Sequence, residues 1–162
     1  MREALAREIE SICTATGAER VSLVSHSMGG LVCRAYLRGH GVRRVARLVT
    51  VGAPHAGTRV ARIGLGANAR QMAPGSAWLA ELAGHEARAL SLGALPPAVA
   101  FFSYHDNYVA PQVSGRLEWA RNVPLGGSGH VEMYLSAHLA DRVAVALAGE
   151  RATLRTAPIR AA

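Results

Sequence analysis

The chain has 162 residues, of which half are apolar and 18% are charged. A chain of this length buries roughly 70% of its extended surface on folding, so it can form one domain with a proper core, and its composition excludes a disordered or a coiled-coil protein. The net charge of +7 comes from arginines dispersed along the chain and aromatic residues make up only 5%, which favours a solvated basic surface over nucleic-acid binding.

Three further classes of protein are disfavoured by simple patterns. No apolar run approaches the roughly 20 residues that a membrane-spanning helix needs. The first 13 residues lack the apolar stretch and small-residue cleavage site of a secretory signal, so the sequence leaves the compartment of a full-length protein open. Cys13 and Cys33 have neither metal-ligand nor redox spacing, and we expect two buried free thiols.

The first third of the chain predicts an alternation of helices and strands. Apolar residues recur on one face of a helix over residues 2–14, and a short strand follows at 21–24. A second helix is expected at 31–38, ending at glycines, and a strand apolar on both faces at 45–51. This order predicts a parallel sheet built with a right-handed crossover.

The rest of the chain predicts an insertion, two more strands and a final helix. Gly and Pro interrupt short helical pieces between about residues 58 and 95, which indicates an insertion or a lid. Strands are expected at 99–103 and 119–123, and a helix at 136–148. We therefore divide the chain into a core at 1–150 and a flexible tail at 151–162.

A serine stands where the first predicted strand runs into the second predicted helix. Ser27 is flanked by Ser25, Gly29 and Gly30, small residues that permit the close approach of strand and helix. This is the GxSxG pattern of a nucleophile elbow, with a serine in place of its first glycine. The Met28 amide, at the start of the helix, would be one donor to an oxyanion.

A serine nucleophile needs a histidine base and an acid that orients it. His130 follows the fourth predicted strand in a glycine-rich loop, which is the chain order expected of such a base. The other six histidines lie in less suitable places. Of the two aspartates, Asp106 directly follows the third predicted strand, whereas Asp141 lies on the polar side of the final helix. Glu118 and Glu132 are alternative acids.

Five motifs, in order, resemble the bacterial triacylglycerol lipase and esterase family: SHSMGG at 25–30, GAPHAGT at 52–58, YHDNYV at 104–109, ARNV at 120–123 and GH at 129–130. The resemblance implies a catalytic triad of Ser27, Asp106 and His130 with Met28 as an oxyanion donor. It implies esters of fatty acids as substrates. It also places His55 beside the active site in a mainly structural segment.

We assign substrate-binding roles to His26, next to the nucleophile, and to His55. No cofactor is expected. Several relatives bind a structural calcium or zinc ion, but no ligand cluster in this sequence predicts a metal site.

The chain departs from that family at its beginning. Family members carry upstream strands and a loop that supplies a second oxyanion amide, and this sequence starts after them. The strand at 21–24 would then be an uncovered sheet edge, which natural proteins avoid. We therefore expect either a missing N-terminal segment or a partner that covers this edge.

The fold class expected from these observations is an α/β-hydrolase-type parallel sheet flanked by helices, shortened at the N-terminus to about four strands. The expected function is a serine carboxylic-ester hydrolase, a lipase or carboxylesterase, with a small-molecule ester or lipid substrate and transient contact with a lipid interface. Two alternatives stay open. One is an acyltransferase or thioesterase on the same triad, and the other is an inactive hydrolase-like fragment with a binding role.

Overall fold

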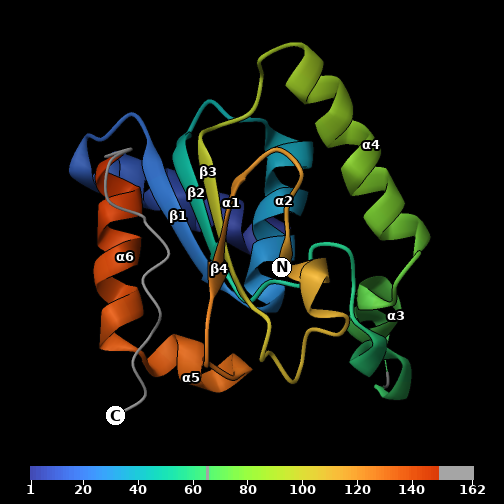
Figure 1. Ribbon diagram of the computed structural model, residues 1–162. Coiled ribbons are helices and arrows are strands. Elements are labelled where there is room, and N and C mark those ends of the chain that lie inside the picture. The colour runs from blue at the N-terminus through green and yellow to red at the C-terminus, as the bar shows by residue number, and fades with distance from the viewer. Residues whose placement is uncertain (65, 150–162) are drawn as a thin grey trace.

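A computed structural model describes residues 1–64 and 66–149 of the chain (Figure 1). The tail predicted at 151–162 lies outside the described residues. In chain order, the elements are α1 (Arg2–Thr16), β1 (Val21–His26), α2 (Met28–His40), β2 (Val45–Val51), η1 (Arg59–Ile63), α3 (Ala67–Met72), α4 (Ala77–Ser91), β3 (Ala98–Ser103), η2 (Gln112–Gly115), β4 (Arg121–Leu125), α5 (His130–Leu135) and α6 (Ala137–Ala148).

The four strands form one parallel sheet in the order β1-β2-β3-β4. The central strand β2 is buried along most of its length, as expected for a parallel strand covered on both faces. The predicted α/β architecture, a parallel sheet of four strands flanked by helices, is therefore confirmed. Because all strands run in the same direction, their carboxyl ends meet at one edge of the sheet, where ligand sites form in open α/β folds.

Each face of the sheet has its own apolar core. On one face, Ile9 of α1 and Leu37 of α2 pack against Leu48 of β2. On the other face, Leu139 of α6 and Met133 of α5 pack with residues of β2, β3 and β4. Figure 1 shows α5 and α6 on one side of the sheet and α1 and α2 on the other, with α4 lying outside α2. None of the helices in the described ranges is long and apolar enough to cross a bilayer.

Strands β1 and β4 are the two edges of the described sheet. On β1, the side chain of Val24 is 51% exposed, although valine in a parallel strand is usually covered. The expectation that a further segment or a partner covers this edge stays a prediction.

Several elements differ from the sequence prediction: β1 ends at His26 and not at residue 24, and α2 begins at Met28 and not at residue 31. Strand β4 begins at Arg121 and not at residue 119, because the Asn122 side chain closes a turn with the backbone of Leu117 and Ala120. It also continues through Pro124, which an edge strand tolerates because one side of its backbone needs no partner. The helix α5 was predicted as a loop, and its first turn is held by the Glu132 carboxylate, which accepts from the Gly129 amide at 3.0 Å.

Candidate active site

Ser27 lies at a sharp corner between β1 and α2. Its backbone has φ 55° and ψ −129°, a conformation that costs a non-glycine residue on the order of 1–3 kcal/mol. The corner is held from β2, because the Ser27 amide donates to the Val51 carbonyl at 2.9 Å. Such a turn lifts the serine hydroxyl clear of its own backbone, as a nucleophile requires.

Glycines after Ser27 allow the helix to approach the sheet closely. A Cβ atom at Gly30 would lie 2.5 Å from the Cβ atom of Ala53, and one at Gly29 would lie 3.3 Å from that of Ser25. A side chain at Gly30 would therefore push α2 away from the sheet. The small residues of the elbow motif are explained by this packing.

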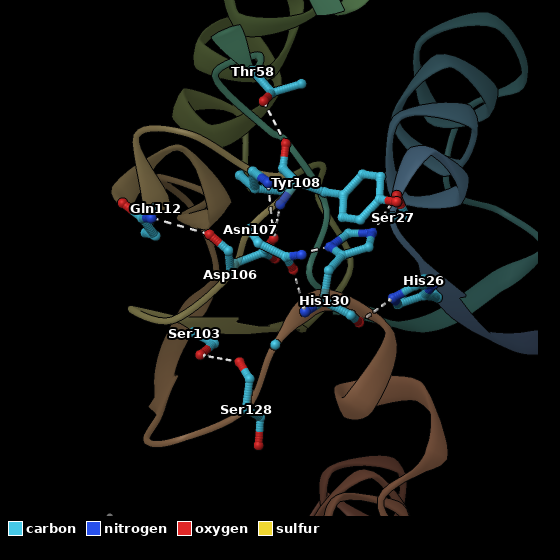
Figure 2. Close-up of polar contacts among 12 residues, drawn as sticks. His26, Ser27, Thr58, Ser103, Asp106, Asn107, Tyr108, Gln112, Ser128 and His130 are labelled. Carbon is cyan, nitrogen blue, oxygen red and sulfur yellow. Dashed lines mark hydrogen bonds and ion pairs between the residues drawn. The ribbon is translucent and has the colours of Figure 1, made fainter. Parts of the chain in front are cut away.

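His130 is the first residue of α5 and its ring lies between Ser27 and Asp106 (Figure 2). Its Nε2 atom is 2.9 Å from the Ser27 hydroxyl oxygen, and its Nδ1 atom is 2.9 Å from the Asp106 carboxylate. A carboxylate can only accept, so Nδ1 carries the proton. In the neutral ring, Nε2 then accepts from the Ser27 hydroxyl, and this order of donors is the one that base catalysis needs.

The Asp106 side chain is 2% exposed and fully engaged. While one of its oxygens accepts from His130, the other accepts from the amides of Tyr108 and Val109, both at 2.8 Å. Burial raises the pKa of Asp106, but the hydrogen bonds from His130, Val109 and Tyr108 outweigh it, and the net pKa lies below its ordinary value. The carboxylate therefore stays charged beside the imidazole at neutral pH.

Two residues hold the His130 backbone, and one of them, Asn107, lies outside the expected set of site residues. The Asn107 side chain accepts from the His130 amide at 3.2 Å. The Nε2 atom of His26 is 3.1 Å from the His130 carbonyl oxygen, so this ring nitrogen must carry a proton and donate. The one feature of the sequence that could have indicated a role for Asn107 is its position next to Asp106 in the YHDNYV motif.

The two histidines expected to bind substrate are placed differently. The His26 ring packs 4.6 Å from the His130 ring and 5.5 Å from that of Tyr134, by their centroids. His55 is buried beneath the elbow, where its Nε2 atom lies 2.9 Å from the Thr50 hydroxyl. Burial, and next to it the charge of Arg34, holds the pKa of His55 well below its ordinary value. Substrate-binding roles for His26 and His55 stay predictions.

Among the candidate acids, Asp106 is the one that bonds to the His130 ring. Asp141 and Glu118 are exposed, and Glu132 bonds to the backbone of Gly129. The amide of Met28, as the first of α2, has no partner within its own helix, and it follows Ser27 directly. Within residues 1–64 and 66–149, no group of three or more His, Cys, Asp or Glu side chains is arranged to hold a metal ion.

Part of the chain is similar in sequence to known hydrolases. The sequence profile of the alpha/beta hydrolase fold family matches residues 2–73. Over 59 residues, the chain is 39% identical to a triacylglycerol lipase from Pseudarthrobacter phenanthrenivorans and to one from Burkholderia plantarii. Each match covers 36% of this chain, but only 18% and 16% of the respective lipase, so the chain spans less than a fifth of these relatives.

Among solved structures, the chain is similar to a protein from Listeria innocua, with a TM-score of 0.69, 14% identity and coverage of 94% of this chain and 67% of the other. It is also similar to the mature Bacillus licheniformis lipase BlEst2, with a TM-score of 0.58, 19% identity and coverage of 88% and 71%. At these identities the similarity establishes a shared fold.

Proposed function

We propose that this chain, which belongs to the α/β-hydrolase fold family, carries the catalytic site of a serine carboxylic-ester hydrolase acting on fatty-acyl or related esters. One observation supports this most strongly. The Ser27 hydroxyl, the His130 imidazole and the Asp106 carboxylate form an unbroken chain with two contacts of 2.9 Å. The lipases similar in sequence support the ester as the substrate class.

The reaction would proceed in two halves. The Ser27 oxygen attacks the ester carbonyl carbon while His130 Nε2 takes the hydroxyl proton, and the carbonyl oxygen becomes an oxyanion beside the Met28 amide. When this intermediate collapses, the bond to the alcohol oxygen breaks and His130 returns the proton to the leaving alcohol. Water then attacks the acyl-enzyme in the same way and releases the acid and free Ser27.

Asp106 supports both halves without changing its own protonation. Its charge stabilises the imidazolium that forms when His130 takes the proton. Its hydrogen bond to Nδ1 fixes the ring in the tautomer that presents Nε2 to Ser27. The lowered pKa of Asp106 keeps it ionised over the neutral range in which such a base works.

The proposal is tested by covalent labelling with a fluorophosphonate and by hydrolysis of p-nitrophenyl acetate. We expect the wild-type chain to label at a single site, and Ser27→Ala to abolish labelling and to lower hydrolysis by at least about 10⁴-fold. Ser22→Ala is the matched control, because Ser22 is an exposed serine on β1, the strand that leads into Ser27, and it should behave as wild type. The proposal fails if the wild-type chain does not label, which would favour a binding role, or if Ser27→Ala still does.

A further inference from the structure

A small cavity of about 200 Å³ opens beside Ser27 and His130. Its walls come from the segment between β2 and β3 and from the loop after β3. The apolar side chains that line it are Pro54, Val60, Ala61, Ala69, Met72 and Val109. In Figure 1, α3 and the segment just before it, which contains η1, lie near the end of the sheet where α2 begins, the end at which Ser27 stands.

The Thr58 hydroxyl in these walls is already engaged. Thr58 donates to the Tyr108 carbonyl at 2.6 Å and accepts from the Ala110 amide at 3.1 Å. It also accepts from the Val60 amide at 3.3 Å. Away from Ser27, His130 and Tyr108, a ligand group inside the cavity therefore meets hydrocarbon, and a polar group placed there would lose its bonds to water without replacement.

The volume of the cavity limits how many carbons of an acyl chain can be buried in it. An apolar cavity of about 150 Å³ accommodates benzene, so 200 Å³ corresponds to a hydrocarbon of about six to eight carbons. A chain of sixteen or eighteen carbons is far larger than this space. The cavity therefore fits the acyl part of a short ester better than that of a long-chain lipid.

We propose that this cavity is the acyl-binding pocket and that it selects acyl groups of about four to eight carbons. This inference rests on the proposed function. With the ester carbonyl at Ser27 and its oxygen toward the Met28 amide, the acyl tail enters the cavity, while the alcohol part leaves past the exposed Tyr108 at the mouth. The chain would then act as an esterase for short acyl groups.

Ala61 and Ala69 determine the acyl length in this arrangement. They come from η1 and α3, are 8% and 7% exposed, and add only a methyl group each to the walls. A larger side chain at either position would occupy the space of several methylene groups of the substrate. Met72, in contrast, is a long side chain in the wall, and its truncation would lengthen the cavity.

The first test compares kcat/KM for p-nitrophenyl acetate, hexanoate and palmitate. In the wild type, we expect hexanoate to exceed both other esters by at least about tenfold, because its extra methylene groups are buried while those of palmitate do not fit. Ala69→Leu should lower the ratio of hexanoate to acetate hydrolysis at least about tenfold, because the larger side chain takes the space of the longer acyl chain. Ala67→Leu, an exposed position on the same helix, should leave this ratio unchanged.

Met72→Ala keeps the test decisive if Ala69→Leu does not fold. This variant removes volume from the wall and should move the preferred ester from hexanoate toward decanoate. The inference is overturned if wild-type activity rises steadily to palmitate. It is also overturned if the folded Ala69→Leu variant keeps the wild-type ratio of hexanoate to acetate, or if Met72→Ala leaves the preference in place.

A binding measurement separates this inference from the proposed function. Methyl hexanoate is titrated into Ser27→Ala protein labelled with ¹³C at the methionine methyl groups, which needs no catalysis. We expect the Met72 signal to shift and the Met133 signal, from the core behind the site, to stay. The shift should vanish in Ser27→Ala/Ala69→Leu. If the wild type shows no esterase activity but Met72 shifts, the proposed function fails and the pocket stands. If esterase activity is present and Met72 does not shift, the pocket fails alone.

Discussion

At the scale of single residues, the site depends on a few side chains that hold other side chains in place. Ser27 adopts a costly backbone conformation, and the hydrogen bond from its amide to Val51 of the neighbouring strand maintains it. The His130 backbone is fixed from two sides, by Asn107 and by His26. The geometry between Ser27 and His130 is thus held by groups outside the triad itself.

His26 gives a direct test of this positioning. Its donation to the His130 carbonyl joins the end of β1, next to Ser27, to the start of α5. Loss of one such bond is worth roughly 0.5–1.5 kcal/mol, so we expect His26→Ala to lower kcat by roughly 2- to 10-fold with little change in KM. His26→Gln keeps an N–H donor and should restore most of the rate. Steady-state kinetics on p-nitrophenyl hexanoate measures both.

The split between kcat and KM decides the role of His26. A substrate-binding His26 would raise KM when removed, and Gln would not rescue it. If His26→Ala raises KM and leaves kcat unchanged, His26 contacts the substrate and does not position His130.

At the scale of elements, a buried ion pair attaches the helix α4 to the rest of the fold. The Arg34 guanidinium on α2 makes two bonds to the Glu86 carboxylate on α4, at 2.7 and 2.8 Å, and a third to the His55 carbonyl at 2.7 Å. Both side chains are less than 10% exposed. This pair fixes α4, part of the segment predicted as an insertion or lid. A lid role for residues 58–95 stays a prediction.

Removing one member of this pair should be costly. Glu86→Gln leaves the Arg34 charge buried without its counter-ion, and such changes typically cost about 3–5 kcal/mol. The matched control is Glu81→Gln, which breaks the Arg38–Glu81 pair on the same two helices. Its side chains are 35% and 55% exposed, so this loss should cost less than about 1 kcal/mol. Urea unfolding followed by circular dichroism gives both free energies. Equal losses in the two variants would show that the buried pair is not a main attachment of α4.

The elements also show what could be predicted from sequence and what could not. Strands such as β2 were predictable because a run apolar on both faces has few other interpretations. The motifs nominated Ser27, Asp106 and His130, and the structure brings their side chains within hydrogen-bonding distance. Their catalytic role is still a proposal.

Other features had no local signal. The pairing of Arg34 with Glu86, 52 positions apart, depends on how two helices pack, and no periodicity in the sequence reports that. The helix α5 is six residues long, too short for a recognisable apolar period. The cavity beside Ser27 is formed by η1, α3 and the loop after β3 together, so its size could be obtained only from the fold.

At the scale of the whole molecule, the buried His55 and the half-buried His26 connect folding to pH. Burial keeps the pKa of His55 well below 6.5, and burial also lowers the pKa of His26. In the unfolded chain both groups bind a proton near pH 6.5. Between that pH and the lower folded pKa, the unfolded state holds more protons, so acidification favours unfolding. Asp106 affects stability in a separate, more acidic pH range, because its folded pKa lies below the ordinary 3.8. Its contribution to the free energy of unfolding is lost only as the pH falls through that lower pKa.

We therefore expect the free energy of unfolding to be nearly constant from pH 8 to 7 and to fall between pH 6.5 and 5, with each of the two histidines contributing at most about 1.4 kcal/mol per pH unit. His55→Gln keeps a polar partner for the Thr50 hydroxyl but cannot take up a proton, so its stability should fall less steeply over the same range. His138→Gln makes the same substitution at an exposed position on α6 and serves as the control. Urea unfolding at pH 7.5, 6.0 and 5.0 measures the slope of the free energy of unfolding against pH for the wild type and the two variants.

A slope for His55→Gln equal to that of the wild type would mean that His55 does not couple protonation to folding, and that the acid sensitivity arises elsewhere in the chain.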